Sequence, residues 1–292
     1  MPHCPRRRAL LLAALASPLM LALPARAEDP AHALLATLEK AAGGRLGVCA
    51  LNTANGKSVL HRADERFPLC STFKVILAGA ILSRSSQVAG LLQQRVHYSQ
   101  GDMVTYSPIT TQHLATGMTI AELCAAAIQY SDNTAANLLL RTLGGPAAVT
   151  AFARSIGDPS LRLDRWETEL NSALPGDPRD TTTPAAMAHS LQALVLGDSL
   201  SAAQREQLQA WLRGNTTGAR RIRAGVPGSW QVGDKTGTGD YGTTNDVGAI
   251  WPERSGPIVL AVYYTQQAAD ARPRDDVIAE ATRIVLGSAA FA

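Results

Sequence analysis

The order of secondary-structure signals along the chain constrains its fold more than any other sequence feature. Short β-type runs lie near the start, at residues 45–52 and 57–62, and return near the end, at residues 230–238, 245–251 and 257–265. Between these two groups the apolar residues recur with a helical period. Because strands from both ends of a chain can share one sheet, this order predicts a sheet domain with a helical insertion.

Local signals indicate where several elements begin and end. Asn55-Gly56 between the first two runs predicts a hairpin, and the glycine-rich segment 237–242 predicts a turn between later strands. Thr119 and Glu122 form a capping box in front of an apolar stripe at helical spacing. We expect further helices at residues 146–156 and 274–286 and after the start signals Thr183-Pro184 and Ser201-x-x-Gln204.

These signals predict an α+β protein with two domains. We assign residues 28–66 and 214–292 to the sheet domain and residues 67–213 to the all-helical domain. A cleft between two domains is a favoured place for a ligand. We therefore expect the functional groups of this chain at the domain boundary.

The first 27 residues have the organisation of an export signal. Three arginines at positions 6–8 precede an apolar run at residues 9–23, and Ala25-Arg26-Ala27 forms a small-x-small cleavage site before Glu28. The run is shorter than a bilayer span and contains a proline, so we expect cleavage near Ala27-Glu28 and no stable membrane anchor. The mature chain would be periplasmic or secreted, by the general route or the twin-arginine route.

Charge argues against a nucleic-acid partner. The formal charge of +3 includes four arginines in the first 27 residues, a segment without acidic residues. Without that segment 23 basic residues face 24 acidic ones, and the formal charge is −1. No excess of positive charge remains to bind phosphates.

Cysteine and histidine spacing does not predict a metal site. The mature chain keeps Cys49, Cys70 and Cys124, and an odd number leaves at least one thiol free or paired between molecules. The histidines form no His-x-x-x-His or His-x-His pair. We expect no dedicated zinc site.

Ser71-Thr72-Phe73-Lys74 opens an apolar helical run, so Ser71 and Lys74 fall on one helix face. A desolvated lysine can accept the proton of a serine nucleophile, and N–H groups at a helix start can stabilise an oxyanion. The alternative is a helix cap followed by a surface lysine. The chain has only four lysines, and the apolar context of Lys74 favours the catalytic interpretation.

Two further motifs contain groups that suit substrate binding and proton transfer. Ser131-Asp132-Asn133 combines a hydroxyl with an amide, although the triplet could also be an ordinary helix cap. Lys235-Thr236-Gly237-Thr238 lies on a predicted late strand, where a cation and hydroxyls suit a carboxylate. An exposed edge strand is the alternative for this second motif.

A charged loop contains the fourth motif. Glu167 and Asn171 could hold one water between them, with Glu167 as general base. Arg165 and Asp180 could close the loop as an ion pair. The alternative is a solvated charged loop with no catalytic role.

Taken together, the four motifs resemble those of the class A serine β-lactamases, with the extended-spectrum and Burkholderia-type penicillinase branch most similar. The resemblance covers residues 28–292. It implies an antiparallel sheet flanked by helices, an inserted helical domain and a monomer without cofactor. It also implies hydrolysis of small-molecule β-lactams, the penicillins and cephalosporins, which would confer antibiotic resistance.

The resemblance implies a role for each group. Ser71 forms the acyl-enzyme, and the N–H groups of Ser71 and Thr238 form the oxyanion hole. Lys74, Glu167 or both activate Ser71, and the choice stays open. The remaining roles are proton transfer to the lactam nitrogen by Ser131, activation of water by Glu167 and Asn171, and substrate binding by Asn133, Lys235, Thr236, Thr238, Arg221 and Tyr106.

Two family disulfides are missing. Gly239 stands where some carbapenem-hydrolysing members pair a second cysteine with Cys70, and Ala78 stands where others pair one with Cys124. Both absences weaken an assignment as a carbapenemase. The ranking of substrates and the response to inhibitors stay open.

Two other functions share part of this pattern. A cell-wall transpeptidase or carboxypeptidase has the first three motifs, and Glu167 with Asn171 distinguishes a hydrolase from it. A non-catalytic β-lactam sensor would stay acylated and would usually have a membrane anchor.

The absence of metal-ligand spacing predicts that activity does not require a metal ion. EDTA should leave hydrolysis of a chromogenic cephalosporin unchanged, because the proposed groups are side chains only. A large loss of rate with the chelator would place the chain in another class of hydrolase.

Overall fold

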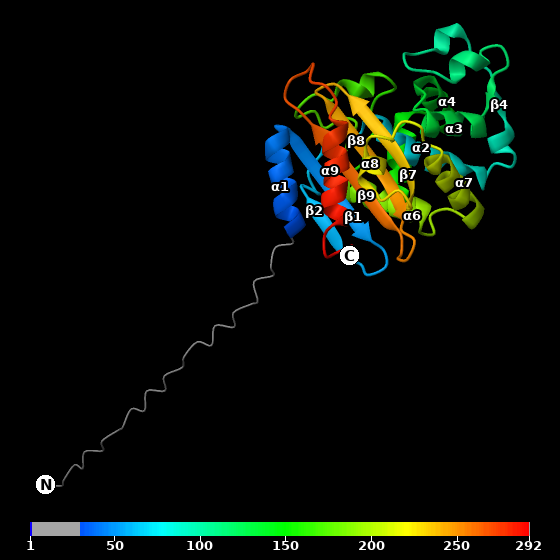
Figure 1. Ribbon diagram of the computed structural model, residues 1–292. Helices are drawn as coiled ribbons and strands as arrows, with labels where there is room; N and C mark the ends of the chain where they lie inside the picture. Colours follow the sequence, from blue (N-terminus) through cyan, green and yellow to red (C-terminus); the bar gives the residue numbers. More distant parts are fainter. Residues whose placement is uncertain (2–29, 292) are drawn as a thin grey trace.

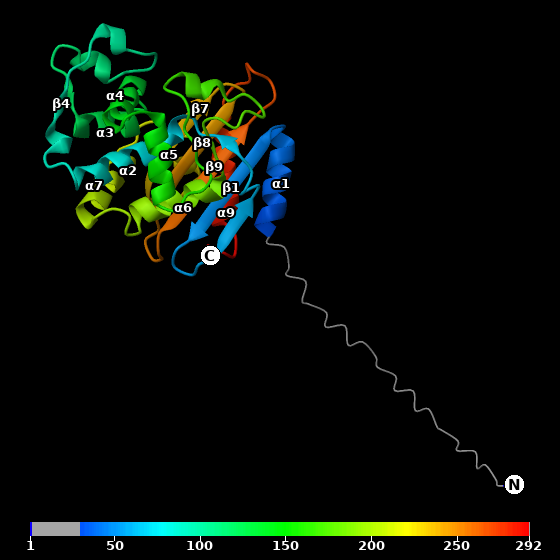
Figure 2. The same ribbon diagram turned by 180° about the vertical axis from the view of Figure 1, so that it is seen from behind.

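The structure is a computed structural model that describes Met1 and residues 30–291. The predicted export signal, residues 1–27, lies outside the described residues apart from Met1. A central sheet separates two groups of helices. Figure 1 shows α1 (Pro30–Ala42) and α9 (Asp275–Leu286) on one face of the sheet, and Figure 2 shows α5 (Pro146–Ser155) and α6 (Pro184–Val195) on the other.

The sheet is antiparallel and joins the two ends of the chain. Its strand order is β2-β1-β9-β8-β7. Strand β1 pairs with β9 along its whole length, with Leu46 opposite Tyr264. The predicted sharing of one sheet by both ends is confirmed. The strands are β1 (Arg45–Asn52), β2 (Ser58–His61), β7 (Gln231–Gly239), β8 (Thr243–Trp251) and β9 (Ile258–Thr265).

The sequence places residues 237–238 both in the predicted strand 230–238 and in the turn-rich segment 237–242, and in the structure β7 continues to Gly239. Gly237, Thr238 and Gly239 continue β7 and pair with Asn245, Thr244 and Thr243 of β8. Ladder pairing along β8 keeps this glycine-rich stretch extended, although its composition favours a turn. The whole Lys-Thr-Gly-Thr motif therefore lies on the edge strand.

The first face of the sheet is covered by helices from both ends of the chain (Figure 1). These are α1 (Pro30–Ala42), the short α8 (Ile222–Gly225) and α9 (Asp275–Leu286). Buried Leu35 and Ile278 pack with Val48 and Val262 of the sheet in one apolar cluster. Helix α1 had no counterpart among the predicted elements.

A larger apolar cluster lies on the opposite face of the sheet, between the sheet and the helices that cover that face. Helix α6 contacts β1, β8 and β9, and helix α7 (Ala202–Arg213) contacts the edge strand β7. Helix α2 is buried from Phe73 to Leu82, as expected of a helix that is apolar on nearly every side. The helices on this side are α2 (Phe73–Ser85), α3 (Ile120–Gln129), α4 (Asn133–Leu143), α5 (Pro146–Ser155), α6 (Pro184–Val195) and α7 (Ala202–Arg213).

Short elements connect the two regions. Strand β3 (Phe67–Pro68) pairs with β6 (Thr181–Thr182), and β4 (Arg95–Val96) pairs with β5 (Met118–Thr119). Single turns of 3-10 helix are η1 (Cys70–Thr72), η2 (Leu91–Gln93), η3 (Gln100–Asp102), η4 (Thr110–His113) and η5 (Glu169–Ser172). The α+β class is confirmed, and the domain limits at residues 66/67 and 213/214 stay a prediction.

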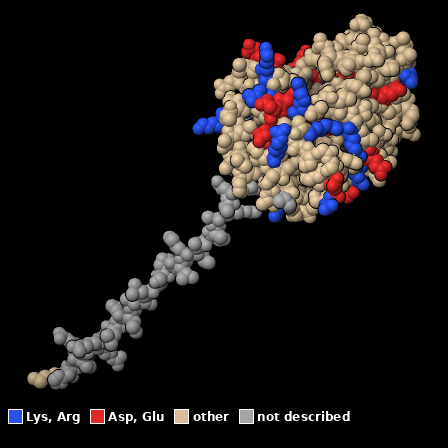
Figure 3. Space-filling view, viewed as in Figure 1, with Lys and Arg blue, Asp and Glu red and all other residues tan. Residues whose placement is uncertain are grey.

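The surface of the protein is mixed in charge, and its described thiols are buried. Basic and acidic side chains are interspersed on the face in Figure 3. None of the described helices is long and apolar enough to cross a membrane. Cys49, Cys70 and Cys124 are free and buried, and burial raises the pKa of each thiol.

Neighbouring leucines in α1 test the packing of that helix on the sheet. Leu35→Ala should lower the free energy of unfolding by about 2–5 kcal/mol, because it empties a fully buried site. Leu34→Ala is the matched control, since Leu34 is exposed and should cost about 0.5 kcal/mol or less. Denaturant unfolding measures both, and equal effects would contradict this packing.

Candidate active site

Ser71 lies where the helical region meets the edge of the sheet. It belongs to η1, which continues directly into α2, and its neighbour Cys70 has a φ of 43°. Strand β7 passes close by: a Cβ on Gly237 would lie 3.0 Å from the carbonyl oxygen of Leu69 and 3.2 Å from Cys70 Cβ. Glycine at position 237 permits this approach, which brings Thr238 near the turn that contains Ser71.

Lys74 lies one helical turn beyond Ser71 and is fully buried. Its Nζ donates to the carbonyl oxygen of Ser131 at 2.9 Å and to Asn133 Oδ1 at 2.7 Å, and it pairs with Glu167 Oε1 at 3.0 Å. Burial lowers the pKa of Lys74, and the Glu167 carboxylate opposes that shift. Three acceptors around one amine form the environment of an ammonium ion.

Glu167 connects Lys74 to the nucleophile. Ser71 Oγ donates to Glu167 Oε1 at 3.3 Å, and Asn171 Nδ2 donates to Glu167 Oε2 at 2.6 Å. The other amide atom of Asn171, Oδ1, is buried and has no hydrogen-bond partner among the described residues. The two side chains therefore present acceptor oxygens beside Ser71, a combination suited to hold and deprotonate water.

The loop that contains Glu167 is closed by charge. Arg165 Nε lies 2.6 Å from Asp180 Oδ2, and Asp180 Oδ1 accepts from the backbone N–H groups of Asp164 and Arg165. Arg165 Nη1 donates to Ser172 Oγ at 3.0 Å, which attaches this pair to η5. The structure thus brings together the two residues that we expected to close the loop.

Ser131 and Lys235 form the opposite side of the site. Lys235 Nζ donates to Ser131 Oγ at 3.1 Å and to the carbonyl oxygen of Thr236 at 2.8 Å. Burial lowers the pKa of Lys235 well below its usual value, and the charge of Lys74 lowers it further. Two buried amines therefore face the same small region, which favours an anionic ligand.

Arg221 supports the strand that contains Lys235. Its Nη2 donates to Thr238 Oγ1 at 2.7 Å, and its Nη1 donates to the carbonyl oxygens of Gly237 and Asn245 at 2.8 and 2.7 Å. Its Nε pairs with Asp275 at 2.7 Å. Arg221 is thus buried and holds Thr238 in place.

The other expected substrate contacts differ in exposure. Asn133 is buried, and its Nδ2 donates to the carbonyl oxygen of Thr105 at 2.9 Å while its Oδ1 accepts from Lys74. Tyr106 is 61% exposed, and its carbonyl oxygen accepts from the Asn133 N–H. Thr236 Oγ1 lies 2.6 Å from Thr217 Oγ1. The structure therefore places Tyr106 beside the residues that hold Lys74.

Two residues support the site without touching the nucleophile, and one of them, Asn137, was missing from the sequence prediction. Asn137 holds Glu167 through its backbone, accepting from the Glu167 N–H at 3.0 Å and donating to the Glu167 carbonyl oxygen at 2.9 Å. Asp132 accepts from Ile109, Thr110 and Ala135 and caps α4. The cap alternative for the Ser-Asp-Asn triplet is thus correct for Asp132, and no local signal identifies Asn137.

Within residues 30–291 no group of three or more potential ligands among His, Cys, Asp and Glu could hold a metal ion. The described site is made of hydroxyls, amines, a carboxylate and amides. Close to it, a Cβ on Gly239 would lie 2.7 Å from Cys70 Sγ. The position expected for the missing disulfide therefore does adjoin Cys70.

Comparison with known proteins agrees with this geometry. The sequence model of the β-lactamase enzyme family matches residues 30–289. The chain is 55% identical to β-lactamase OXY-1 of Klebsiella oxytoca over 281 residues. This aligned region is 96% of this chain and 97% of that protein. The chain is also 58% identical to β-lactamase CTX-M-97 of Escherichia coli over 251 residues, or 86% of each chain.

Solved structures give the same result. The chain matches a β-lactamase of Desulfarculus baarsii DSM 2075 with a TM-score of 0.88 and 59% identity, over 89% of this chain and 98% of that one. A mutant of the last common ancestor of Gram-negative bacteria class A β-lactamase matches with a TM-score of 0.85 and 60% identity, over 88% and 97% of the two chains. The chain belongs to the class A β-lactamases.

A buried acid pair lies behind the substrate-binding strand of this class A β-lactamase. Asp246 on β8 and Asp234 on β7 are both fully buried. Asp234 pairs with Arg223 at 2.7 Å and accepts from Asn215. Asp246 accepts only from the Ile222 N–H, and its Oδ1 has no partner among the described residues. Burial, and next the charge of Asp234, raises the pKa of Asp246 well above its usual value.

Asp246→Asn tests this assignment. Folded Asp246 holds a proton that the unfolded chain loses above about pH 4, so its contribution to stability decreases as pH rises. The substitution should raise the midpoint of thermal unfolding more at pH 7.5 than at pH 4.5. Asp234→Asn should instead lower the midpoint at pH 7.5, because Arg223 loses its carboxylate partner. The free energy of unfolding should fall by about 3–5 kcal/mol. A uniform loss from Asp246→Asn at both pH values would contradict the assignment.

Proposed function

We propose that the chain hydrolyses the β-lactam amide of penicillins and cephalosporins through an ester on Ser71, and so confers resistance to these antibiotics. The observation that carries this proposal is the buried array in which Glu167 accepts from Ser71, pairs with Lys74 and accepts from Asn171. A nucleophile, a base and a water-binding pair coincide there. Membership of the β-lactamase family supports it.

Acylation begins with Ser71. Its Oγ attacks the lactam carbonyl carbon while its proton passes to Glu167, because Glu167 Oε1 is the acceptor already bonded to it and Lys74 has three acceptors of its own. The N–H groups of Ser71 and Thr238 stabilise the oxyanion. The carbon–nitrogen bond then breaks, and Ser131, hydrogen-bonded to Lys235, transfers its proton to the nitrogen. The Lys74 ammonium, which contacts both Glu167 and Ser131, gives a proton to Ser131 and takes the one held by Glu167, so Glu167 is again ionised for the next step.

Deacylation uses the other side of the same carboxylate. Glu167 and Asn171 orient a water, Glu167 takes one of its protons, and the oxygen attacks the ester carbon. The ester bond breaks, and the proton returns to Ser71. A transpeptidase lacks this pair, and a sensor would remain acylated, so the Glu167–Asn171 contact favours a hydrolase over both alternatives.

The substrate carboxylate binds beside β7. Lys235 supplies charge, Thr236 and Thr238 supply hydroxyls, and Arg221 fixes Thr238. Asn133 provides an amide for a substrate carbonyl, and Tyr106 lines the mouth by apolar contact. We further propose that the chain acts as a monomer after export and cleavage near Ala27-Glu28.

The ester intermediate can be observed directly in Glu167→Gln. Hydrolysis of benzylpenicillin should fall by about 10²–10⁴-fold, because water loses its general base. Ester formation should slow less, since Lys74 without its carboxylate partner has a lower pKa and can accept the Ser71 proton. Intact mass spectrometry should then show a stoichiometric adduct.

Ser71→Ala provides the matched control. It removes the attacking hydroxyl, so no covalent adduct should form. Turnover should fall to the small residual rate that substrate binding and the oxyanion hole alone provide. An adduct in Ser71→Ala, or Glu167→Gln with wild-type turnover and no adduct, would refute the mechanism.

A further inference from the structure

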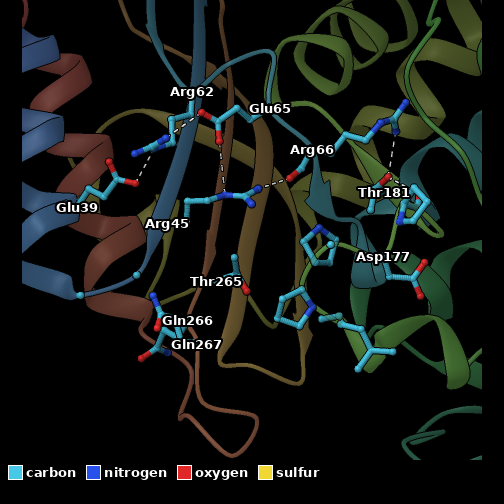
Figure 4. A pocket seen from close by; sticks show the side chains of 18 of the residues that line it. Glu39, Arg45, Arg62, Glu65, Arg66, Asp177, Thr181, Thr265, Gln266 and Gln267 are labelled. Carbon is cyan, nitrogen blue, oxygen red and sulfur yellow. Dashed lines mark hydrogen bonds and ion pairs between the residues drawn. The ribbon is translucent and has the colours of Figure 1, made fainter.

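A cavity of about 1060 Å³ lies outside the active site, between the sheet domain and the loop that contains Glu167. Its walls come from the end of α1, the start of β1, the segment after β2, the end of β9 and residues 173–178. Figure 4 shows Arg45 in the middle, with Glu39 and Arg62 on one side and Asp177 and Thr181 on the other. None of the proposed catalytic side chains lines it.

Arg45 is an incompletely paired cation in this cavity. Its Nη2 donates to the carbonyl oxygen of Arg66, and its plane stacks over the Phe67 ring at 4.2 Å. Its Nε is buried without a hydrogen-bond partner, and the nearest acid, Glu65 Oε2, lies 3.7 Å away. Nη1 makes no hydrogen bond to any described residue. A guanidinium can donate five hydrogen bonds, so donors remain available for a ligand.

The acids that line the cavity make their hydrogen bonds to groups other than Arg45. Glu39 accepts from Arg62, His61 and the Leu46 N–H. Glu65 Oε1 accepts from Arg62 at 2.8 Å. Asp177 pairs with Arg179, which lies outside the lining. Arg45 therefore keeps one carboxylate partner, Glu65, at 3.7 Å, a distance too long for a hydrogen bond. Burial lowers the pKa of Arg45, and the charge of Glu65 opposes that shift.

An apolar wall faces this cation. Ala173, Leu174, Pro175 and Pro178 of the catalytic loop line the cavity together with Pro68. Leu174 is 44% exposed, which is a large fraction for a leucine next to a cavity. A pocket with a charged donor that has free N–H groups and with an apolar wall is suited to a ligand with one anionic end and an apolar body.

We propose that this cavity binds small organic acids with one carboxylate and an apolar body, with the carboxylate on Arg45 and the body against Leu174 and its neighbouring prolines. A planar guanidinium binds a carboxylate through two parallel hydrogen bonds. Such a ligand contacts the outer surface of the loop whose inner surface presents Glu167. The site is separate from the one that binds the β-lactam carboxylate.

Calorimetric titration of the mature chain with 4-phenylbutyrate tests the proposal. The catalytic site is first saturated with phenylboronic acid, so that a second carboxylate site is observed alone. We expect saturable binding with a dissociation constant of about 1 mM or tighter. The neutral amide 4-phenylbutyramide should bind at least about tenfold more weakly, because it lacks the charge that Arg45 recognises.

Two variants locate the site. Arg45→Gln should weaken binding of 4-phenylbutyrate about tenfold. Leu174→Asp should weaken binding to a similar extent, because the new carboxylate repels the ligand. Leu174 is partly exposed, so the variant should still fold. Arg283→Gln, on the exposed surface of α9, is the control and should bind as the wild type does.

Three results would overturn the proposal. One is no saturable binding up to about 10 mM. Another is equal binding of the acid and the amide. The third is unchanged affinity in both Arg45→Gln and Leu174→Asp. Because the readout is binding with the catalytic site occupied, these results are independent of the hydrolytic mechanism.

Discussion

The buried ion pair between Lys74 and Glu167 is the interaction on which the rest of the site depends. Both side chains are fully removed from solvent, and burying two charges costs several kcal/mol per ion unless other groups compensate. Compensation comes from Ser131, Asn133, Asn171 and Ser71. These groups belong to separate elements, so the ion pair is stable only when α2, the start of α4 and the charged loop meet.

The same requirement explains the second layer of the site. Lys235 is a second buried amine close enough to Lys74 for its pKa to be lowered by that charge. The β7 edge on which it lies is fixed by Arg221, and Arg221 is in turn paired with Asp275 at the start of α9. Residues from the end of the chain therefore position groups that act with residues near its beginning, which agrees with a sheet built from both ends.

Sequence patterns predicted those parts of the molecule that depend on local chemistry. The hairpin, the capping boxes at Thr119 and Ser201 and the α+β class needed only turn residues and periodicity. Contacts between distant segments were not accessible in this way. Asn137 holds Glu167 across 30 positions, and Gly239 extends β7 one residue beyond the predicted strand by pairing with Thr243 of β8. The orphan oxygen of Asp246 likewise results from packing that no local pattern records.

The distribution of lysine has a practical consequence. Of the four lysines in the chain, Lys74 and Lys235 are fully buried, whereas Lys40 and Lys57 are exposed on the sheet domain. Amine-reactive dyes or resins would therefore attach through the sheet domain and spare the catalytic amines. The enzyme should therefore be suited to immobilisation through its lysines without modification of Lys74 or Lys235.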